Sequence, residues 1–171
     1  LGALLNEVAG SAAAAVRQEL VVGVIRGKGP REIARNISKV SRIARNRSLL
    51  IARTEALRAY RTTSLSAFNE NASVVKGWTW QATYDTRTCA VCWAMSGTEH
   101  ELTETLDSHP GCRCTMIPLT RSWAELGFKG IPDSRPQIPV GTSVFDALPS
   151  SDQLKILGPG KYRAYQAGQL S

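Results

Sequence analysis

All four cysteines of the chain and one of its two histidines lie within a stretch of 26 residues. They form two short motifs, Cys89-Ala-Val-Cys92 and His109-Pro-Gly-Cys112-Arg-Cys114. A Cys-x-x-Cys turn directs two thiolates at one ion, and the 19 residues between Cys92 and Cys112 match the separation between two zinc half-sites. The spacing therefore predicts a structural Zn²⁺ site.

The two motifs together offer one donor more than a four-coordinate zinc ion needs. We expect Cys89, Cys92, His109 and Cys112 to be the ligands. Cys114 is the alternate, because a strand that follows the turn would bring its sulfur in place of His109 and give a four-cysteine site. The competing interpretation is one or two disulfides, for which four cysteines allow three connectivities. No secretion signal is visible, and a reducing compartment favours metal.

Zinc at this place would have an architectural function. A structural zinc site contributes on the order of 10 to 16 kcal/mol of apparent binding free energy, enough to order a half of the chain that is rich in loops. That half carries Gly97, Pro110-Gly111, Gly127 and Gly130, followed by three prolines between residues 132 and 139.

Catalytic signatures are missing from the sequence. His100 is followed by Glu101, but this pair comes after the Cys-x-x-Cys motif, whereas a zinc deaminase needs it before. There is no His-Glu-x-x-His, Gly-x-Ser-x-Gly or Walker motif, and a thiol that holds zinc is not a nucleophile. We therefore expect no catalytic residue and no cofactor besides structural zinc. A zinc-braced HNH-like nuclease is the enzyme alternative, because the chain is basic.

The elements that must position these donors follow from periodicity and from helix start and stop signals. A Gly-Lys-Gly stop followed by Pro30 separates two helices, and a seven-residue repeat of Ile43, Leu50 and Leu57 marks the longest helix. Alternation of aromatic with polar residues after Gly77 predicts a strand whose Trp78, Trp80, Ala82 and Tyr84 share one face. The predicted helices are 3–26, 30–40, 42–71, 123–126, 152–157 and 161–167, and the predicted strand is 78–84.

Polar residues interrupt the apolar stripe of the longest helix. Arg47, Thr54 and Arg61 fall inside that stripe, where burial without partners would cost free energy. One interpretation is that they pair across an interface with a partner. The other is that the arginine stems lie along apolar surface with their charged heads in water. The sequence leaves both open.

Charge divides the 171 residues into unequal halves. Residues 1–76 carry 13 Lys and Arg against 5 Glu, whereas residues 77–171 carry 8 against 9 acidic groups, which gives the net charge of +7. We predict an α+β protein with two domains: a basic helical arm over 1–76 with one long helix, and a Cys/His-braced module over 77–171 with few strands and short C-terminal helices. A basic arm attracts acidic protein faces or phosphates, so double-stranded DNA is a second, weaker partner.

The order of these motifs resembles one family. Arg53-Thr54-Glu55 on a long helix precedes a Trp80 strand, Asp85-Thr86-Arg87-Thr88-Cys89-x-x-Cys92, Gly97 and the His109-Pro-Gly-Cys112-Arg-Cys114 motif. This arrangement resembles the head morphogenesis proteins of tailed bacteriophages, the Mu F-like group of minor head or minor capsid proteins, most strongly over residues 30–118. Leu157-Gly-Pro-Gly-Lys-Tyr162 resembles the closing segment of that family.

The resemblance implies a non-catalytic component of the virion that is present in few copies. Such a protein is assembled in the cytoplasm of the bacterial host and associates with the portal protein and the major capsid protein, at the portal vertex and in the head interior. It would serve head assembly, or DNA packaging or ejection, without a membrane or a small-molecule substrate. A bilayer span is not expected either, since the apolar stretches are much shorter than about 20 residues.

Carried over residue by residue, the resemblance places Cys89, Cys92, His109, Cys112 and Cys114 in the metal cluster and Asp85 and Arg87 in the segment that enters it. We expect Asp85 to accept backbone N–H groups in its turn or to accept from a ligating histidine. We expect Arg87 to pair with Glu55 and so to lock the long helix onto the zinc module.

Overall fold

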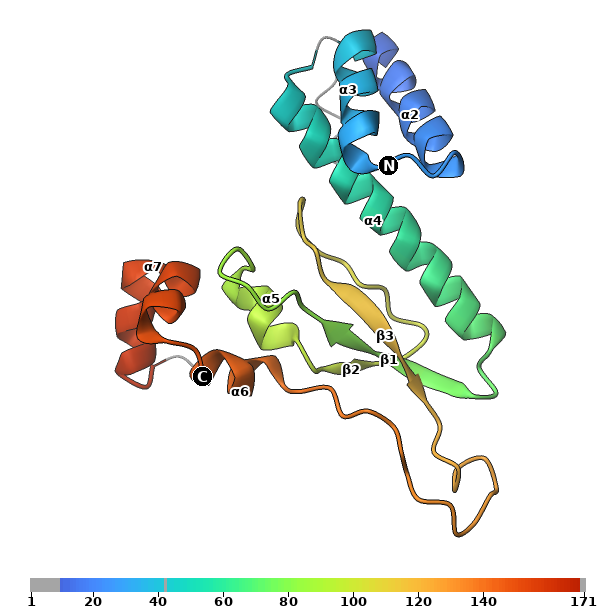
Figure 1. Ribbon diagram of the computed structural model, residues 1–171, viewed down its shortest axis with the longest axis vertical. Helices are drawn as coiled ribbons and strands as arrows, with labels where there is room; N and C mark the ends of the chain where they lie inside the picture. The colour runs from blue at the N-terminus through green and yellow to red at the C-terminus, as the bar shows by residue number, and fades with distance from the viewer. Residues whose placement is uncertain (1–9, 42, 170–171) are drawn as a thin grey trace. The chain divides into compact units, whose positions relative to one another are not determined.

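The computed structural model describes residues 10–41 and 43–169 (Figure 1). It confirms the predicted α+β class, with N-terminal helices, a small antiparallel sheet and short C-terminal helices. Two parts of the predicted helices, residues 3–9 and Arg42, lie outside the described residues. The elements in chain order are α2 (Gly10–Ile25), α3 (Pro30–Ser41), α4 (Arg45–Glu70), β1 (Val75–Gln81), α5 (Ala90–Met95), β2 (Glu99–His100), β3 (Thr115–Thr120), α6 (Gly141–Asp146) and α7 (Ser150–Gln166).

The chain forms two compact units. The helical unit contains Leu1–Thr63 together with Asp107–Cys112, and the sheet unit contains Ser64–Leu106 and Arg113–Ser171. The predicted division into domains 1–76 and 77–171 stays a prediction. Among the described residues, no helix is long and apolar enough to cross a bilayer.

The helical unit has its own apolar core, contributed by α2, α3 and the first half of α4. α3 begins at Pro30, as predicted, and Glu32 in its first turn pairs with Lys28 at 2.9 Å. The helices α2 and α3 approach so closely at Gly23 that a Cβ there would lie 2.6 Å from Ile33. The buried residues of this core are Val16, Leu20, Ile33, Ala34, Ile37, Ile51 and Ala52.

β1 is the central strand of a three-stranded antiparallel sheet with the order β2-β1-β3. Trp78 lies opposite His100 of β2 and opposite Pro118 of β3. The predicted strand 78–84 is therefore shifted, because pairing with β3 begins at Val75 and ends at Gln81. Thr79 is also buried, so the strict alternation expected for a half-buried strand fails at the centre of the sheet.

The C-terminal half contains two short helices that the sequence analysis did not predict, α5 and α6. Conversely, the predicted helix 123–126 is a single turn: Ser122 and Glu125 form the expected capping box, but no further turn follows. The two predicted C-terminal helices are confirmed, since α7 breaks at Gly158, whose φ of 73° is non-helical.

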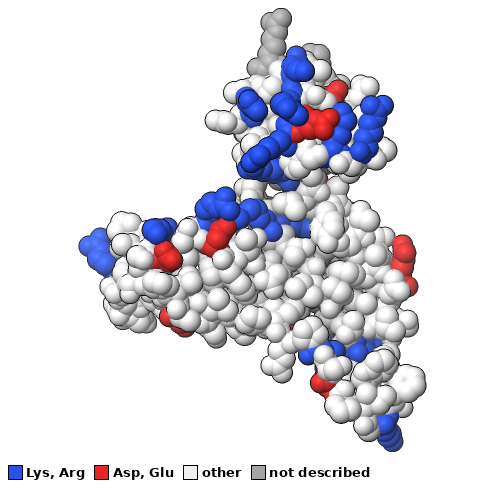
Figure 2. All heavy atoms as spheres, viewed as in Figure 1, with Lys and Arg blue, Asp and Glu red and all other residues white. Residues whose placement is uncertain are grey.

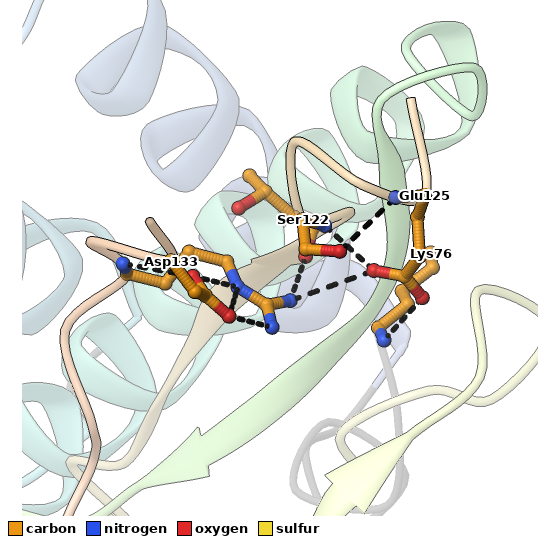
Figure 3. Close-up of polar contacts among 6 residues, drawn as sticks. Lys76, Ser122, Glu125 and Asp133 are labelled. Carbon is orange, nitrogen blue, oxygen red and sulfur yellow. Dashed lines mark hydrogen bonds and ion pairs between the residues drawn. The ribbon is translucent and has the colours of Figure 1, made fainter. Parts of the chain in front are cut away.

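An ion-pair cluster holds the loop after β3 to the sheet (Figure 3). Glu125 accepts from Lys76 of β1 at 2.9 Å and from the backbone N–H of Ser122 at 2.6 Å. Arg135 binds Asp133 and donates to the carbonyl of Thr120 at the end of β3. These contacts order a segment that has no regular secondary structure of its own.

Candidate metal centre

The first cysteine motif is held by the start of α5. Cys89 has an extended backbone at the N-cap position, and its Sγ accepts a hydrogen bond from the backbone N–H of Cys92 at 3.4 Å. A sulfur atom in this position satisfies one of the free N–H groups of the first helical turn. Cys92 itself is buried in α5. The local fold thus presents both sulfurs from one turn of chain.

The second motif is a tight turn that leads into β3. Gly111 has a φ of +78°, which favours glycine, and the backbone N–H of Cys112 donates to the carbonyl of His109 at 3.2 Å. Cys114 comes directly before Thr115, the first residue of β3. Cys112 and Cys114 are buried, whereas His109 is exposed.

The five predicted donors form two groups of three that share Cys92. One group is Cys89, Cys92 and His109, and the other is Cys92, Cys112 and Cys114; within each, the ligand atoms lie within 4.8 Å of one another. Four thiolates around zinc at 2.3 Å lie about 3.8 Å apart, so small side-chain adjustments convert either group into part of a tetrahedron. Sulfur and imidazole donors suit zinc, and the cluster could hold a metal ion. The choice of four ligands among the five stays a prediction.

α4 anchors the turn of the second motif. Thr54 Oγ1 accepts the backbone N–H of Gly111 at 2.9 Å and donates to the carbonyl of Leu50 at 2.8 Å. Arg61, which is 9% exposed, donates to the carbonyl of Cys112 at 3.2 Å. The polar residues inside the apolar stripe of the long helix therefore have hydrogen-bond partners within the chain. A role of Thr54, Arg61 and the half-buried Arg47 in binding another protein stays a prediction.

Asp85 organises the turn that leads into Cys89. Its carboxylate accepts the backbone N–H of Arg87 at 2.9 Å, which is the first of the two roles expected for it. It also accepts hydrogen bonds from both terminal nitrogens of Arg113, at 2.7 and 2.5 Å. The hydrogen bonds from Arg113, and then those from Arg87, hold the pKa of Asp85 well below its ordinary value.

The expected pairing of Arg87 with Glu55 stays a prediction. Arg87 binds Asp85 in its own turn and is 77% exposed at the side chain, while Glu55 accepts from Arg58 one turn along α4 at 2.9 Å.

A comparison of the sequence with models of protein families gives a match. The profile of the family described as Phage Mu protein F like protein matches residues 14–117, more than half of the chain. The chain belongs to this family. Searches of curated proteins and of solved structures found no significant match.

Membership in the Phage Mu protein F like family identifies the chain as a phage head morphogenesis protein, a component of the virion. The matched range begins in α2 and ends at Ile117 in β3. It includes all five candidate donors, the Asp85 turn and the α4 residues that anchor the second motif. Families of this kind are generally structural.

Sequence reasoning missed Arg113 and Thr88. Arg113 lies between two cysteines of the Mu F-like motif, and that position is the one signal that could have drawn attention to it. Thr88 is buried, accepts from Arg113 at 3.1 Å and donates to the carbonyl of Thr83. Neither contact is visible in a linear pattern, because the partners are brought together by the fold.

The other histidine has a structural environment. His100 stacks on Trp78 with ring centroids 4.2 Å apart, and its two nitrogens lie 2.9 Å from Thr98 Oγ1 and from a carboxylate oxygen of Glu104. Thr98 donates its hydroxyl proton to the carbonyl of Met95 at 2.7 Å, so His100 is not placed to take that proton. The group resembles a catalytic triad in connectivity alone.

Proposed function

We propose that the chain is a minor head protein of a tailed phage, a non-catalytic assembly component that binds the portal protein and the major capsid protein at the portal vertex and in the head interior. The observation that carries this proposal is the family match over residues 14–117, which includes α3, α4, α5 and the whole Cys/His cluster. DNA binding is the weaker alternative. A nuclease has weaker support too, since no nuclease geometry accompanies the cluster in the part of the chain that the structure describes.

The helical unit supplies the binding surface in this proposal. Lys and Arg gather over this unit on the face shown in Figure 2. On α3, Arg31, Arg35 and Lys39 follow one another at four-residue intervals and are exposed, while Ile33 and Ile37 face the core. A row of cations on one helix face is complementary to an acidic surface of a portal or capsid subunit.

The metal centre has a structural role in this proposal. Zinc held by four of Cys89, Cys92, His109, Cys112 and Cys114 would stabilise the loop-rich part and provide no reaction step. Four cysteine sulfurs, three of them on buried residues, fit a closed structural site better than an open catalytic one.

A binding experiment tests the function. Purified chain is applied to immobilised portal protein, and separately to major capsid protein, of the same phage. We expect retention of the wild type and at least tenfold weaker retention of a variant with Arg31, Arg35 and Lys39 changed to Gln. A matched control changes the exposed Lys129, Lys155 and Lys161 to Gln, which alters the net charge equally.

Failure of the wild type to bind either protein would contradict the assembly function. The nuclease alternative is tested in parallel on supercoiled DNA with added divalent metal. We expect no cleavage; cleavage that is lost on His109→Ala would establish the enzyme in place of the assembly protein.

A further inference from the structure

We propose that Asp85 and Arg113 are positioning residues of the metal centre: their two-point contact holds the cysteine motifs ready for a metal ion. The inference rests on the metal centre of the proposed function and adds residues that do not themselves touch the ion. Arg113 is bonded through the backbone to both Cys112 and Cys114, and Asp85 begins the turn that leads into Cys89. One contact therefore links the chain segments of the two motifs.

The geometry of the contact is specific. Arg113 Nη1 lies 2.7 Å from Asp85 Oδ2, and Arg113 Nη2 lies 2.5 Å from Asp85 Oδ1. Two parallel charge-assisted hydrogen bonds fix the guanidinium plane as well as its position, which a lysine ammonium cannot do. The side chains are 34% and 30% exposed, so the pair is partly shielded from water.

Further hydrogen bonds fix both partners. Arg113 Nη2 also donates to Thr88 Oγ1 at 3.1 Å. Thr88 is buried and directly precedes Cys89 in the chain. The backbone N–H of Thr88 donates to the carbonyl of Asp85 at 3.1 Å, which closes the turn. A rotation of Arg113 would therefore disturb Asp85 and Thr88, which lie in the turn before Cys89.

Such a link affects metal affinity through preorganisation. The 19 residues between Cys92 and Cys112 form a loop, and bringing its ends together costs conformational entropy. When a contact inside the protein has already closed the loop, this loss of entropy no longer reduces the free energy of metal binding. Partners that orient metal ligands typically change metal affinity by 10- to 100-fold.

Two contacts in the same unit serve as controls. Arg87 binds the same Asp85 carboxylate, but it lies in the Asp85 turn itself and links no second segment. Arg135 makes an equivalent contact with Asp133, with Nη2 at 2.6 Å from Oδ2, in the loop after β3. Arg87→Lys tests loss of the other guanidinium contact to Asp85, and Arg135→Lys tests loss of an arginine–aspartate contact as such.

The experiment measures Zn²⁺ affinity of the purified full chain by competition with a chromophoric chelator, and records the Co²⁺ absorption spectrum of each variant. We expect Arg113→Lys and Asp85→Asn to bind Zn²⁺ at least tenfold more weakly, with the Co²⁺ stoichiometry and sulfur-to-metal bands of the wild type. Arg87→Lys and Arg135→Lys should stay within threefold of the wild type.

Circular dichroism of each apo protein shows whether the variant is folded. If Arg113→Lys does not fold, the exchange Asp85→Arg with Arg113→Asp is used, and recovery of affinity is expected. Wild-type affinity in folded Arg113→Lys, or an equal loss in Arg135→Lys, would overturn the positioning role. A wild type that binds neither Zn²⁺ nor Co²⁺ would overturn the metal centre too, whereas the assembly function is decided separately by portal and capsid binding.

Discussion

At the scale of single residues, Cys92 has the most connected position in the metal centre. It belongs to both groups of donors found among the described residues, and it is 3% exposed. We predict that Cys92→Ser abolishes Zn²⁺ binding whichever other three residues complete the site. Elemental analysis with thiol counting on freshly purified protein, without added reductant, measures this.

The same assay ranks the two alternate ligands. Cys114 is 1% exposed and lies in a group with two other buried sulfurs, whereas His109 is exposed. A buried donor is harder to replace by water, so we predict that Cys114→Ser loses more zinc than His109→Ala. The opposite ranking would favour the site with three cysteines and His109. Two thiols too few, with no zinc, would show a disulfide instead.

A third prediction at the scale of residues comes from a close backbone approach between α5 and α6. A Cβ on Gly141 would lie 2.1 Å from the carbonyl oxygen of Trp93, while its own N–H donates to the carbonyl of Ser96 at 2.7 Å. We predict that Gly141→Ala separates α6 from α5 and lowers the free energy of unfolding by about 1 to 3 kcal/mol in urea denaturation. Gly160→Ala is the control, because no atom lies within 4 Å of a Cβ there.

At the scale of elements, the ion-pair cluster after β3 makes the sheet unit sensitive to acid. The backbone N–H of Ser122, Lys76 and the Ser122 hydroxyl together lower the pKa of Glu125 to about 2. A carboxylate with a depressed pKa stabilises the folded state fully above its unfolded value, here 4.5, and this contribution is lost as the pH falls toward 2. The loop should therefore loosen within this window.

Glu125→Gln tests the pH dependence. We predict that the variant is less stable than the wild type at pH 6 and that the difference shrinks as the pH is lowered from about 4.5 toward 2. Thermal unfolding at a series of pH values measures the difference. Glu101→Gln, which removes another exposed carboxylate of the same unit, should show no such convergence.

Elements with a strong local signal could be predicted from the sequence. α3 was predictable because Pro30 fixes its start and its apolar residues repeat with helical period, and the break in α7 because Gly158 takes a positive φ. β2 and β3 could not be predicted from the sequence. β2 has only two residues, and β3 is an edge strand that contains Pro118, so both exist through pairing with β1. α5 and α6 are too short for a periodic pattern.

The candidate site divides in the same way. Its five candidate donors were evident from residue type and spacing, because Cys and His in paired short motifs are the pattern typical of metal sites. The residues that support the donors were not, because Thr54, Arg61 and Arg113 act through contacts with residues 28 to 57 positions away in the chain. Non-local hydrogen bonds leave little periodic trace in a sequence.

At the scale of the whole molecule, the uneven distribution of charge determines which part of the chain binds polyanions such as DNA. Residues 1–76 hold 13 of its 21 Lys and Arg, and Arg31, Arg35 and Lys39 form an exposed row on α3. Duplex DNA bound by such a surface releases counterions, so the logarithm of the affinity should fall linearly with the logarithm of the salt concentration. We predict weak, sequence-independent binding with this behaviour.

Neutralising the α3 row identifies the surface responsible. Changing Arg31, Arg35 and Lys39 to Gln should reduce the slope of the salt dependence by about 2 to 3, because each lost phosphate contact lowers it by about 0.9. Fluorescence anisotropy with a labelled duplex at 50 to 200 mM salt measures the slope. The variant with Lys129, Lys155 and Lys161 changed to Gln has the same net charge, so an equal change in both variants would mean that DNA responds to overall charge and that α3 is no specific contact.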